Sequence, residues 1–282
     1  MSTKIVKETG VARPEPDALT SSVLDHATIK EVTSFGLRNN DGLWPSYNCL
    51  DTTIPTPMCP DPVAEKAFGF ASWVPAFEFA MYGGAQCSAV GLDVNDQESE
   101  VGRVFRRNEG RGVEEALRDI RFVAPDSDAE VQWDEPVDLT PTSPDLTLAQ
   151  AVAVLEGYAA AVYAGAPTLH LPRAAVPLLG SDVLVWRGNK AFTVNGSKVA
   201  IGGGYDQFTV PPSGEWDLYA TGEVYVERSS EVLIQSYVLP GDGSGIGSDE
   251  NGLPDNTVVT LAERMYRVAV DCFVAKATGT VW

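Results

Sequence analysis

The chain has 282 residues, of which 44% are hydrophobic and 21% charged, a composition that is typical of a globular protein and excludes general disorder. The formal net charge of −19 argues against nucleic acid as a directly bound partner, because phosphate binding requires a basic surface. No run of 18 apolar residues is present, and the first residues lack the apolar core of a signal peptide, so we expect no membrane span and maturation in a cytoplasm. The four cysteines, Cys49, Cys59, Cys87 and Cys272, are too widely spaced to suggest a disulfide framework.

The N-terminal part divides into two segments of different character. Residues 1–45 are polar and interrupted by prolines and by Gly36, which favours an extended arm with one short helix near residues 22–33. A disordered tail is the alternative. Residues 46–92 are rich in proline, threonine and aromatic residues, and the prolines exclude a regular helix over the first half. Aromatic side chains on such an excursion indicate a surface that is buried against something else, with a second small core as the alternative.

Residues 93–121 carry the clearest helix pattern. Acidic residues come first and basic residues follow, an order that suits the helix dipole. Apolar residues recur near helical spacing but form only one thin stripe. Gly102, Gly110 and Gly112 weaken the helix by about 1 kcal/mol each relative to alanine. The pattern predicts a long charged helix that lies across a surface and is not buried on all sides.

A polar linker over residues 126–145 marks a subdomain boundary and precedes a second predicted helix. Thr147 is a good N-cap and Gln150 completes the capping box, while Gly165 and Pro167 end the helix. Five segments between residues 183 and 238 then have strand character. The C-terminal part contains an alternating pattern that predicts one strand over residues 265–274.

The stretch "GNKAFTVNGSKVAIGGGY" predicts a hairpin followed by a sharp bend. Asn195-Gly196 is a strong signal for a two-residue turn between strands, and the glycines at 202–204 permit the bend. A phosphate-binding loop requires a helix after the glycines, but two prolines follow instead. We therefore interpret residues 205–216 as a projecting loop and exclude a nucleotide site.

No motif assembles a catalytic or metal site. The two histidines, His26 and His170, have no metal-type spacing, and we interpret His170 as a buried residue with satisfied hydrogen bonds. The sequence has no G-x-S-x-G and no C-x-x-C. The loop over residues 241–252 contains oxygen donors, Asp242 and Asp249 among them, but lacks the residue order of a helix-loop-helix calcium site. We expect no enzyme activity, no cofactor and no structural metal, and calcium in this loop remains an alternative.

Several phrases of the sequence resemble the major capsid proteins of the Hong Kong 97 type, a fold that encapsulins also use. They are "VFRRNEGRGVEEAL", "LAQAVAVLEGYAAAVYAGAPTLHLPRAAVPLLG", "GNKAFTVNGSKVAIGGGY", "ATGEVYVERSSEVL" and "LAERMYRVAVDC", and they are most similar to coat proteins of tailed actinobacterial phages. The resemblance covers most of residues 93–275. It implies an α+β fold with an N-terminal arm (1–45), an extended E-loop region (46–92), a spine helix and peripheral (P) domain (93–146), an axial (A) domain (147–262), and a returning P-domain strand with the C-terminus (263–282).

The resemblance also implies a function. The chain would self-assemble into pentamers and hexamers of an icosahedral phage head that encloses double-stranded DNA without binding it specifically. A scaffolding protein, a portal and a decoration protein are possible partners, and the location is the virion, assembled in the cytoplasm of a bacterial host. The alternatives are a connector or neck component, a minor head protein, and an encapsulin-like compartment that holds protein cargo.

In this interpretation the functional residues are interface residues. Extended segments bury aromatic surface between subunits, and contacts between unlike faces close into rings and shells. The expected aromatic anchors on neighbouring subunits are Trp44, Tyr47, Phe68, Phe70, Trp73, Phe77 and Phe79. The arginines expected to pair with acidic groups of an adjacent subunit are Arg103, Arg106, Arg107 and Arg111. The residues expected in loops at the capsomer axis (205–216 and 241–256) include Tyr205, Trp216, Asp242 and Asp249.

Overall fold

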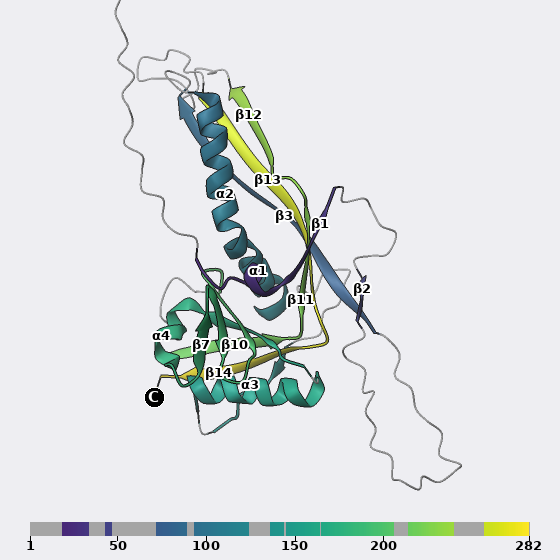
Figure 1. The fold of residues 1–282 in the computed structure, drawn as a ribbon, viewed down its shortest axis with the longest axis vertical. Coiled ribbons are helices and arrows are strands. Elements are labelled where there is room, and N and C mark those ends of the chain that lie inside the picture. The colour runs from purple at the N-terminus through teal and green to yellow at the C-terminus, as the bar shows by residue number, and fades with distance from the viewer. Residues whose placement is uncertain are drawn as a thin grey trace, which may run out of the picture.

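A computed structural model of the chain describes two β-sheets and the helices packed on them (Figure 1). The described residues are 19–33, 43–46, 72–88, 93–123, 136–143, 145–163, 165–205, 214–239 and 257–281. In this part of the chain, no helix is both long enough and apolar enough to cross a membrane.

The longer sheet is built on two antiparallel strands, β3 (Ser72–Ser88) and β13 (Thr257–Val270), which pair from Ala76 opposite Ala269 onward. The strand order is β1-β11-β13-β3-β2, and β12 pairs with the part of β13 that β11 does not reach. The remaining strands are β1 (Thr28–Val32), β2 (Leu43–Ser46), β11 (Val224–Ser229) and β12 (Leu233–Leu239). We call this the long sheet, and it gives the molecule its elongated shape (Figure 1).

Helix α2 (Val94–Leu117) lies along one face of the long sheet (Figure 1). It begins at Asp93, whose side chain accepts a hydrogen bond of 3.0 Å from the Asn95 N–H, and it continues into a π-helical turn, η1 (Arg118–Val123). The residues that it buries against the sheet and its neighbours include Val101, Phe105, Val113 and Leu117. The prediction of a long charged helix over residues 93–121, packed through one stripe, is confirmed.

The glycines of α2 have a packing reason. A Cβ at Gly112 would lie 2.1 Å from Met81 Sδ on β3, and a Cβ at Gly102 would lie 2.5 Å from Ile234 Cδ1 on β12. Glycine lowers the helix propensity at both positions. Both contacts are with the ends of flexible side chains, so glycine lets α2 approach the sheet without moving Met81 or Ile234 from these positions.

The second sheet lies at the other end of the molecule, with α3 (Leu148–Val162) across it (Figure 1). Its order is β4-β14-β10-β6-β9-β8-β7, with β5 beside β14. Its strands are β4 (Val137–Asp138), β5 (Leu146–Thr147), β6 (Thr168–Pro172), β7 (Leu184–Arg187), β8 (Lys190–Thr193), β9 (Lys198–Gly202), β10 (Glu215–Thr221) and β14 (Val274–Thr280). The short helices η2 (Arg173–Ala175) and α4 (Val176–Leu179) follow β6. Its core includes the fully buried Leu155, Ala159, Leu169, Leu171 and Leu218.

Two local predictions in this part are confirmed. The Thr147 hydroxyl accepts a hydrogen bond of 3.3 Å from the Gln150 N–H, and Gln150 Oε1 accepts one of 2.9 Å from the Thr147 N–H, which is the expected capping box of α3. Strands β8 and β9 form the expected antiparallel hairpin. Its turn has three residues, 194–196, and not the expected two, because the Thr193 N–H donates to Ser197 O at 2.9 Å and the Gly196 N–H donates to Thr193 O at 3.0 Å. Gly196 ends the turn with φ of 97°.

The helix in the N-terminal segment is shorter than expected. Residues 23–26 form α1 (Val23–His26), and the chain then extends as β1 at the edge of the long sheet, parallel to β11. The prediction of a helix near residues 22–33 therefore holds only for its first turn, because β1 is stabilised by pairing with a strand nearly 200 residues away that local pattern cannot reveal.

The predicted domain boundaries differ from the arrangement of the strands. β11 and β12 fall within residues 147–262 but belong to the long sheet, and the boundary between 262 and 263 lies inside the unbroken β13. β14, expected as part of a returning P-domain strand, pairs with β10 in the second sheet. The chain thus crosses between the two sheets several times, so that no single sequence interval corresponds to either sheet.

The predicted strand over residues 265–274 is two strands with a break between them. The break lies at Cys272, which has φ of 62°, and the preceding Asp271 N–H donates a hydrogen bond of 2.8 Å to Glu223 O. No glycine or proline marks the position, which is why the alternating pattern reads through it. Cys272 is also disulfide-bonded, with a partner outside the described side chains. The wide spacing of the cysteines did not suggest a disulfide framework, but one disulfide forms at Cys272, since distance in sequence does not limit distance in space.

Candidate assembly surfaces

The segment of residues 19–27, which leads into α1, is fixed to the body of the protein through Ser21. This residue is fully buried, and its φ of 61° is unusual for a residue with a side chain. The Ser21 carbonyl accepts a hydrogen bond of 2.6 Å from the Ile201 N–H. The Ser21 hydroxyl donates to Val199 O at 2.7 Å and accepts from the Ala191 N–H at 2.9 Å. The base of the predicted arm is therefore part of the folded body.

Glu114 joins this segment to α2 and to the glycine-rich turn after β9. Its carboxylate is fully buried, and it accepts hydrogen bonds from the Val23 N–H at 2.9 Å and from the Gly204 N–H at 3.1 Å. Burial raises the pKa of Glu114 from 4.5 to about 7, although both backbone donors act in the opposite direction. None of the described residues forms an ion pair with it. Glu114 thus ties three separate segments together without a counter-charge.

The close packing around Glu114 explains the glycine triplet. A Cβ at Gly204 would lie 2.4 Å from Glu114 Cβ and 2.5 Å from Arg111 O. The triplet bends the chain, as the sequence predicts, but it also brings the turn against α2, which the sequence does not reveal. Glycine is therefore needed here because the turn packs against α2, and this packing explains the glycines without a ligand.

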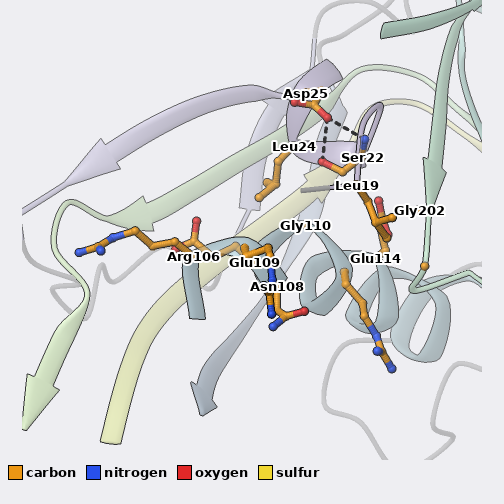
Figure 2. Close-up of a pocket in the computed structure, with 13 residues that line it drawn as sticks. Leu19, Ser22, Leu24, Asp25, Arg106, Asn108, Glu109, Gly110, Glu114 and Gly202 are labelled. Atoms are coloured by element: carbon orange, nitrogen blue, oxygen red, sulfur yellow. Dashed lines mark hydrogen bonds between the residues drawn. The ribbon is translucent and has the colours of Figure 1, made fainter. Parts of the chain in front are cut away.

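A cavity of about 330 Å³ opens beside this junction, between α1 and α2 (Figure 2). Leu24 and Asp25 line it from α1, and Asp25 accepts hydrogen bonds from the N–H and hydroxyl of Ser22 (Figure 2). Arg106 borders it from α2 but points away from Glu114 (Figure 2). The charged groups do not converge on one point, so the cavity has no evident ligand site.

The four predicted arginines have different surroundings. Arg103 forms an ion pair of 2.6 Å with Glu100, and Arg111 forms one of 2.8 Å with Glu115, each within α2. Within the described part of the chain no ion pair involves Arg106 or Arg107. Exposed pairs of this kind contribute only about 0–1 kcal/mol and exchange readily. Pairing of the four arginines with a neighbouring subunit remains a prediction. Arg103 and Arg111 would have to exchange a partner within α2, whereas Arg106 and Arg107 have no ion pair to break among the described residues.

Two of the predicted aromatic anchors belong to the core of the subunit itself. Phe77 is only 7% exposed, and it stacks on Phe79, which stacks in turn on Tyr266, with ring centroids 5.9 Å and 5.2 Å apart. These rings lie between β3 and α2. The sequence did not reveal this, because the alternation along β3 does not tell which face of the strand is covered. Phe77 is therefore buried and Phe79 partly buried within the subunit itself, and their interface role stays a prediction.

The other aromatic anchors keep their status as predictions. Trp44 lies on β2 and Trp73 on β3, in the backbone positions that pair the two strands, but their side chains are outside the described part. Tyr47, Phe68 and Phe70 lie outside the described residues.

The residues expected in loops at the capsomer axis are also revised. Tyr205 and Trp216 are both 5% exposed, so they anchor the ends of their loop in the protein and do not project from it. Tyr205 Oη lies 2.7 Å from His170 Nδ1, and His170 Nε2 lies 2.9 Å from Thr221 Oγ1. The prediction that His170 is buried and hydrogen-bonded is confirmed, and burial lowers its pKa to about 3. Asp242 and Asp249 lie outside the described residues.

The face of the long sheet opposite α2 carries an apolar surface that sequence reasoning missed. Tyr82 on β3 is 76% exposed, and Leu233 on β12, Tyr237 on β12 and Met265 on β13 are 41–48% exposed. Glu263 lies between Tyr82 and Leu233 in the register of the strands, and Met265 is two residues further on the same face. We call these four apolar residues the open face. The period-two alternation of β3 and β12 was the signal that could have revealed it.

The described residues contain no group of three or more histidine, cysteine, aspartate or glutamate side chains that could hold a metal ion.

Comparison with known proteins identifies the fold. No protein-family model matches the sequence, and no curated protein matches it either. Among solved structures, a chain of Mycobacterium phage Ogopogo superposes with a TM-score of 0.51 at 16% identity, covering 94% of each chain. A chain of Gordonia phage Cozz superposes with a TM-score of 0.51 at 12% identity, covering 98% of this chain and 90% of that one.

Both neighbours are chains of phages, and the protein has the Hong Kong 97-type fold. The α+β class and the fold expected from the resemblance are confirmed. The capsid of a native GTA particle is a further similar structure, with a TM-score of 0.49 at 11% identity over 99% of both chains.

Proposed function

We propose that the chain is a major capsid protein that assembles into pentamers and hexamers of an icosahedral phage head enclosing double-stranded DNA. The observation that supports the proposal is the end-to-end correspondence with a chain of Mycobacterium phage Ogopogo, which covers 94% of both chains. In these terms the long sheet with α2 is the P-domain, and the second sheet with α3 is the A-domain.

The subunit has the physical features that such assembly needs. A stable interface buries about 1,600 Å² in total and has an apolar centre. The open face offers exposed tyrosine, leucine and methionine side chains, and α2 offers Arg106 and Arg107 on the other side of the sheet. Contacts between unlike surfaces of identical subunits close into rings and, with two ring sizes, into a shell. Trp44, Trp73 and the other aromatic residues of 43–73 would add contacts with neighbours.

The charge of the subunit fits a container for DNA. A net charge of −19 favours repulsion of phosphate, so packaged DNA would be held by confinement and not by specific contacts. A scaffolding protein, a portal and a decoration protein are the partners that a head of this kind would use, and the virion is the location that follows.

The proposal is tested on the full-length protein expressed without other phage proteins. Light scattering gives the mass, negative-stain images give the shape, and absorbance and protein gels give the content of nucleic acid and of other proteins. We expect closed particles, or rings that convert into them when concentration or salt is raised. A single ring or tube of fixed size would favour a connector or neck component, and closed shells filled with a specific protein would favour an encapsulin-like compartment.

A further inference from the structure

Cys272 lies where the chain crosses from the long sheet to the second sheet, between the end of β13 and the start of β14. The backbone is held at this crossing: the Asp271 N–H donates to Glu223 O at 2.8 Å, and the Asp271 carbonyl accepts from the Gly222 N–H at 3.2 Å. A Cβ at Gly222 would lie 2.5 Å from that carbonyl oxygen, so the two turns pack closely. Cys272 therefore has a fixed place in the fold, and its half-buried side chain packs against the core of the second sheet.

The register of the long sheet excludes one of the three cysteines that could be the disulfide partner of Cys272. Cys87 on β3 pairs with Val258, and β13 runs unbroken from there to Val270, next to the crossing. Because an extended strand rises about 3.3 Å per residue, Val258 and Val270 are about 40 Å apart. The Cα atoms of a disulfide are only about 4–7 Å apart. Cys87 thus lies at the wrong end of the long sheet to bond Cys272 of the same subunit.

The other two cysteines, Cys49 and Cys59, belong to the chain segment between β2 and β3. β2 pairs with the part of β3 that precedes Ala76, and Ala76 lies opposite Ala269, close to the end of β13. The segment therefore leaves the long sheet and returns to it at the end where Cys272 lies (Figure 1). Either cysteine has a short chain path to Cys272.

We propose that Cys272 is joined to Cys49 or Cys59, so that a disulfide ties the segment between β2 and β3 to the crossing of the two sheets, and that this bond forms after the protein has left the cytoplasm. The timing rests on the proposed function, because a virion passes from a cytoplasm that keeps thiols reduced into oxidising surroundings. The side chain of Cys272 is not fully buried, so a small oxidant has access to it.

The oxidant in this step is a low-molecular-weight disulfide, for which glutathione disulfide is the probe. One cysteine loses its proton, and its thiolate attacks a sulfur of glutathione disulfide and displaces one glutathione thiolate. The thiolate of the second cysteine then attacks the mixed disulfide and displaces the other glutathione, and the two released thiolates take up the two protons. Two protein thiols are thereby oxidised to one disulfide, and one glutathione disulfide is reduced to two glutathione molecules.

Thiol mapping of the full-length protein expressed in bacterial cells tests both parts of the proposal. One portion of the cells is lysed in denaturant with N-ethylmaleimide, which alkylates every free thiol. From a second portion the protein is purified, treated with glutathione disulfide and then alkylated in the same way. We expect adducts on all four cysteines in the first sample. In the second, a digest without reductant should contain a peptide that joins Cys272 to Cys49 or to Cys59, with Cys87 still alkylated.

Thermal unfolding before and after oxidation shows whether the bond supports the fold. A disulfide restricts the unfolded chain, and this one closes a loop that includes most of the sequence, so oxidation should raise the Tm by about 5 °C or more. Cys272→Ser should abolish the rise. Cys87→Ser is the matched control and should keep it.

Three results would overturn the proposal. A peptide that joins Cys272 to Cys87 or to another copy of the chain, or alkylation of Cys272 after oxidation, would contradict the tie. A disulfide already present in the cells lysed with N-ethylmaleimide would contradict the timing. The peptides are read on the wild-type subunit, so they do not depend on the folding of a variant. Failure to form particles would count against the proposed function and would leave the tie to be judged from the peptides.

Discussion

Arg264 Nη1 on β13 lies 2.7 Å from Glu109 Oε1 on α2, and the side chains of both residues are less than 10% exposed. Arg228 on β11 binds the other carboxylate oxygen of Glu109 at 3.1 Å, and Arg264 also donates to the carbonyl oxygens of Ser229 and Ser230. This buried network holds α2 on the long sheet near the middle of β13. At this point β13 stops pairing with β12 and begins to pair with β11.

Replacement of Glu109 by alanine should therefore be strongly destabilising. It removes the buried carboxylate that pairs with the Arg264 guanidinium and leaves only the half-exposed Glu31, 3.7 Å away, and the loss of one partner of a buried ion pair costs about 3–5 kcal/mol. Urea unfolding of the dispersed subunit measures the change. Glu100→Ala, which breaks the exposed pair with Arg103, is the matched control and should cost less than about 1 kcal/mol. Equal effects of the two substitutions would show that the Glu109 network does not fasten α2.

Gly204→Ala should destabilise the junction at the base of the arm. The new methyl group would lie 2.5 Å from Arg111 O and 2.6 Å from the Glu115 N, and backbone atoms of a helix cannot move aside as a side chain can. We expect a loss of about 1–3 kcal/mol in the free energy of unfolding. Gly157→Ala in α3 is the control, since nothing lies within 4 Å of its Cβ position, and it should be neutral or stabilising by up to about 1 kcal/mol. The reverse order of the two variants would contradict the packing described.

Phe77 and Trp73 should separate core from interface on the same strand. Phe77→Ala removes a ring that is buried in the subunit and should lower the free energy of unfolding by about 3–5 kcal/mol. Trp73→Ala should leave a folded subunit that assembles poorly, as the proposed contact of Trp73 with a neighbour requires. Thermal unfolding and the yield of particles are measured on both variants. Wild-type particle yield from Trp73→Ala would refute its interface role.

Tyr82→Lys should impair assembly without affecting the fold. The side chain is 76% exposed in the isolated subunit, so a charged substitution there should change the free energy of unfolding by less than about 0.5 kcal/mol. If the open face is covered in the particle, the same charge would be buried without a partner, and assembly should fail or require a much higher protein concentration. Particles formed at the wild-type concentration would show that the open face remains exposed to solvent.

The sequence predicts those parts of the fold whose signals are local. The cap at Thr147 and the hairpin around Asn195-Gly196 depend on neighbouring residues, and the structure confirms both. The resemblance added the fold, which no local pattern contains.

The remaining features depend on which faces meet in space. Alternation along β3 is the same whether Phe77 or Tyr82 faces α2, so the sequence could not tell a core residue from a surface one. Tyr205 and Trp216 stand beside turn-forming residues but are the buried ends of their loop. Glu114 is one acidic residue among many in a chain of net charge −19, and only the glycine triplet that packs on it could have drawn attention to its burial.

The most direct test of the proposed function is cryo-electron microscopy of the particles that the full-length protein forms on its own or with an added scaffolding protein. The account predicts a closed shell whose capsomers contain five and six copies of the subunit, with the open face of the long sheet covered by a neighbouring copy. Monomers that do not respond to concentration, salt or scaffold, or a single ring that never closes, would contradict it.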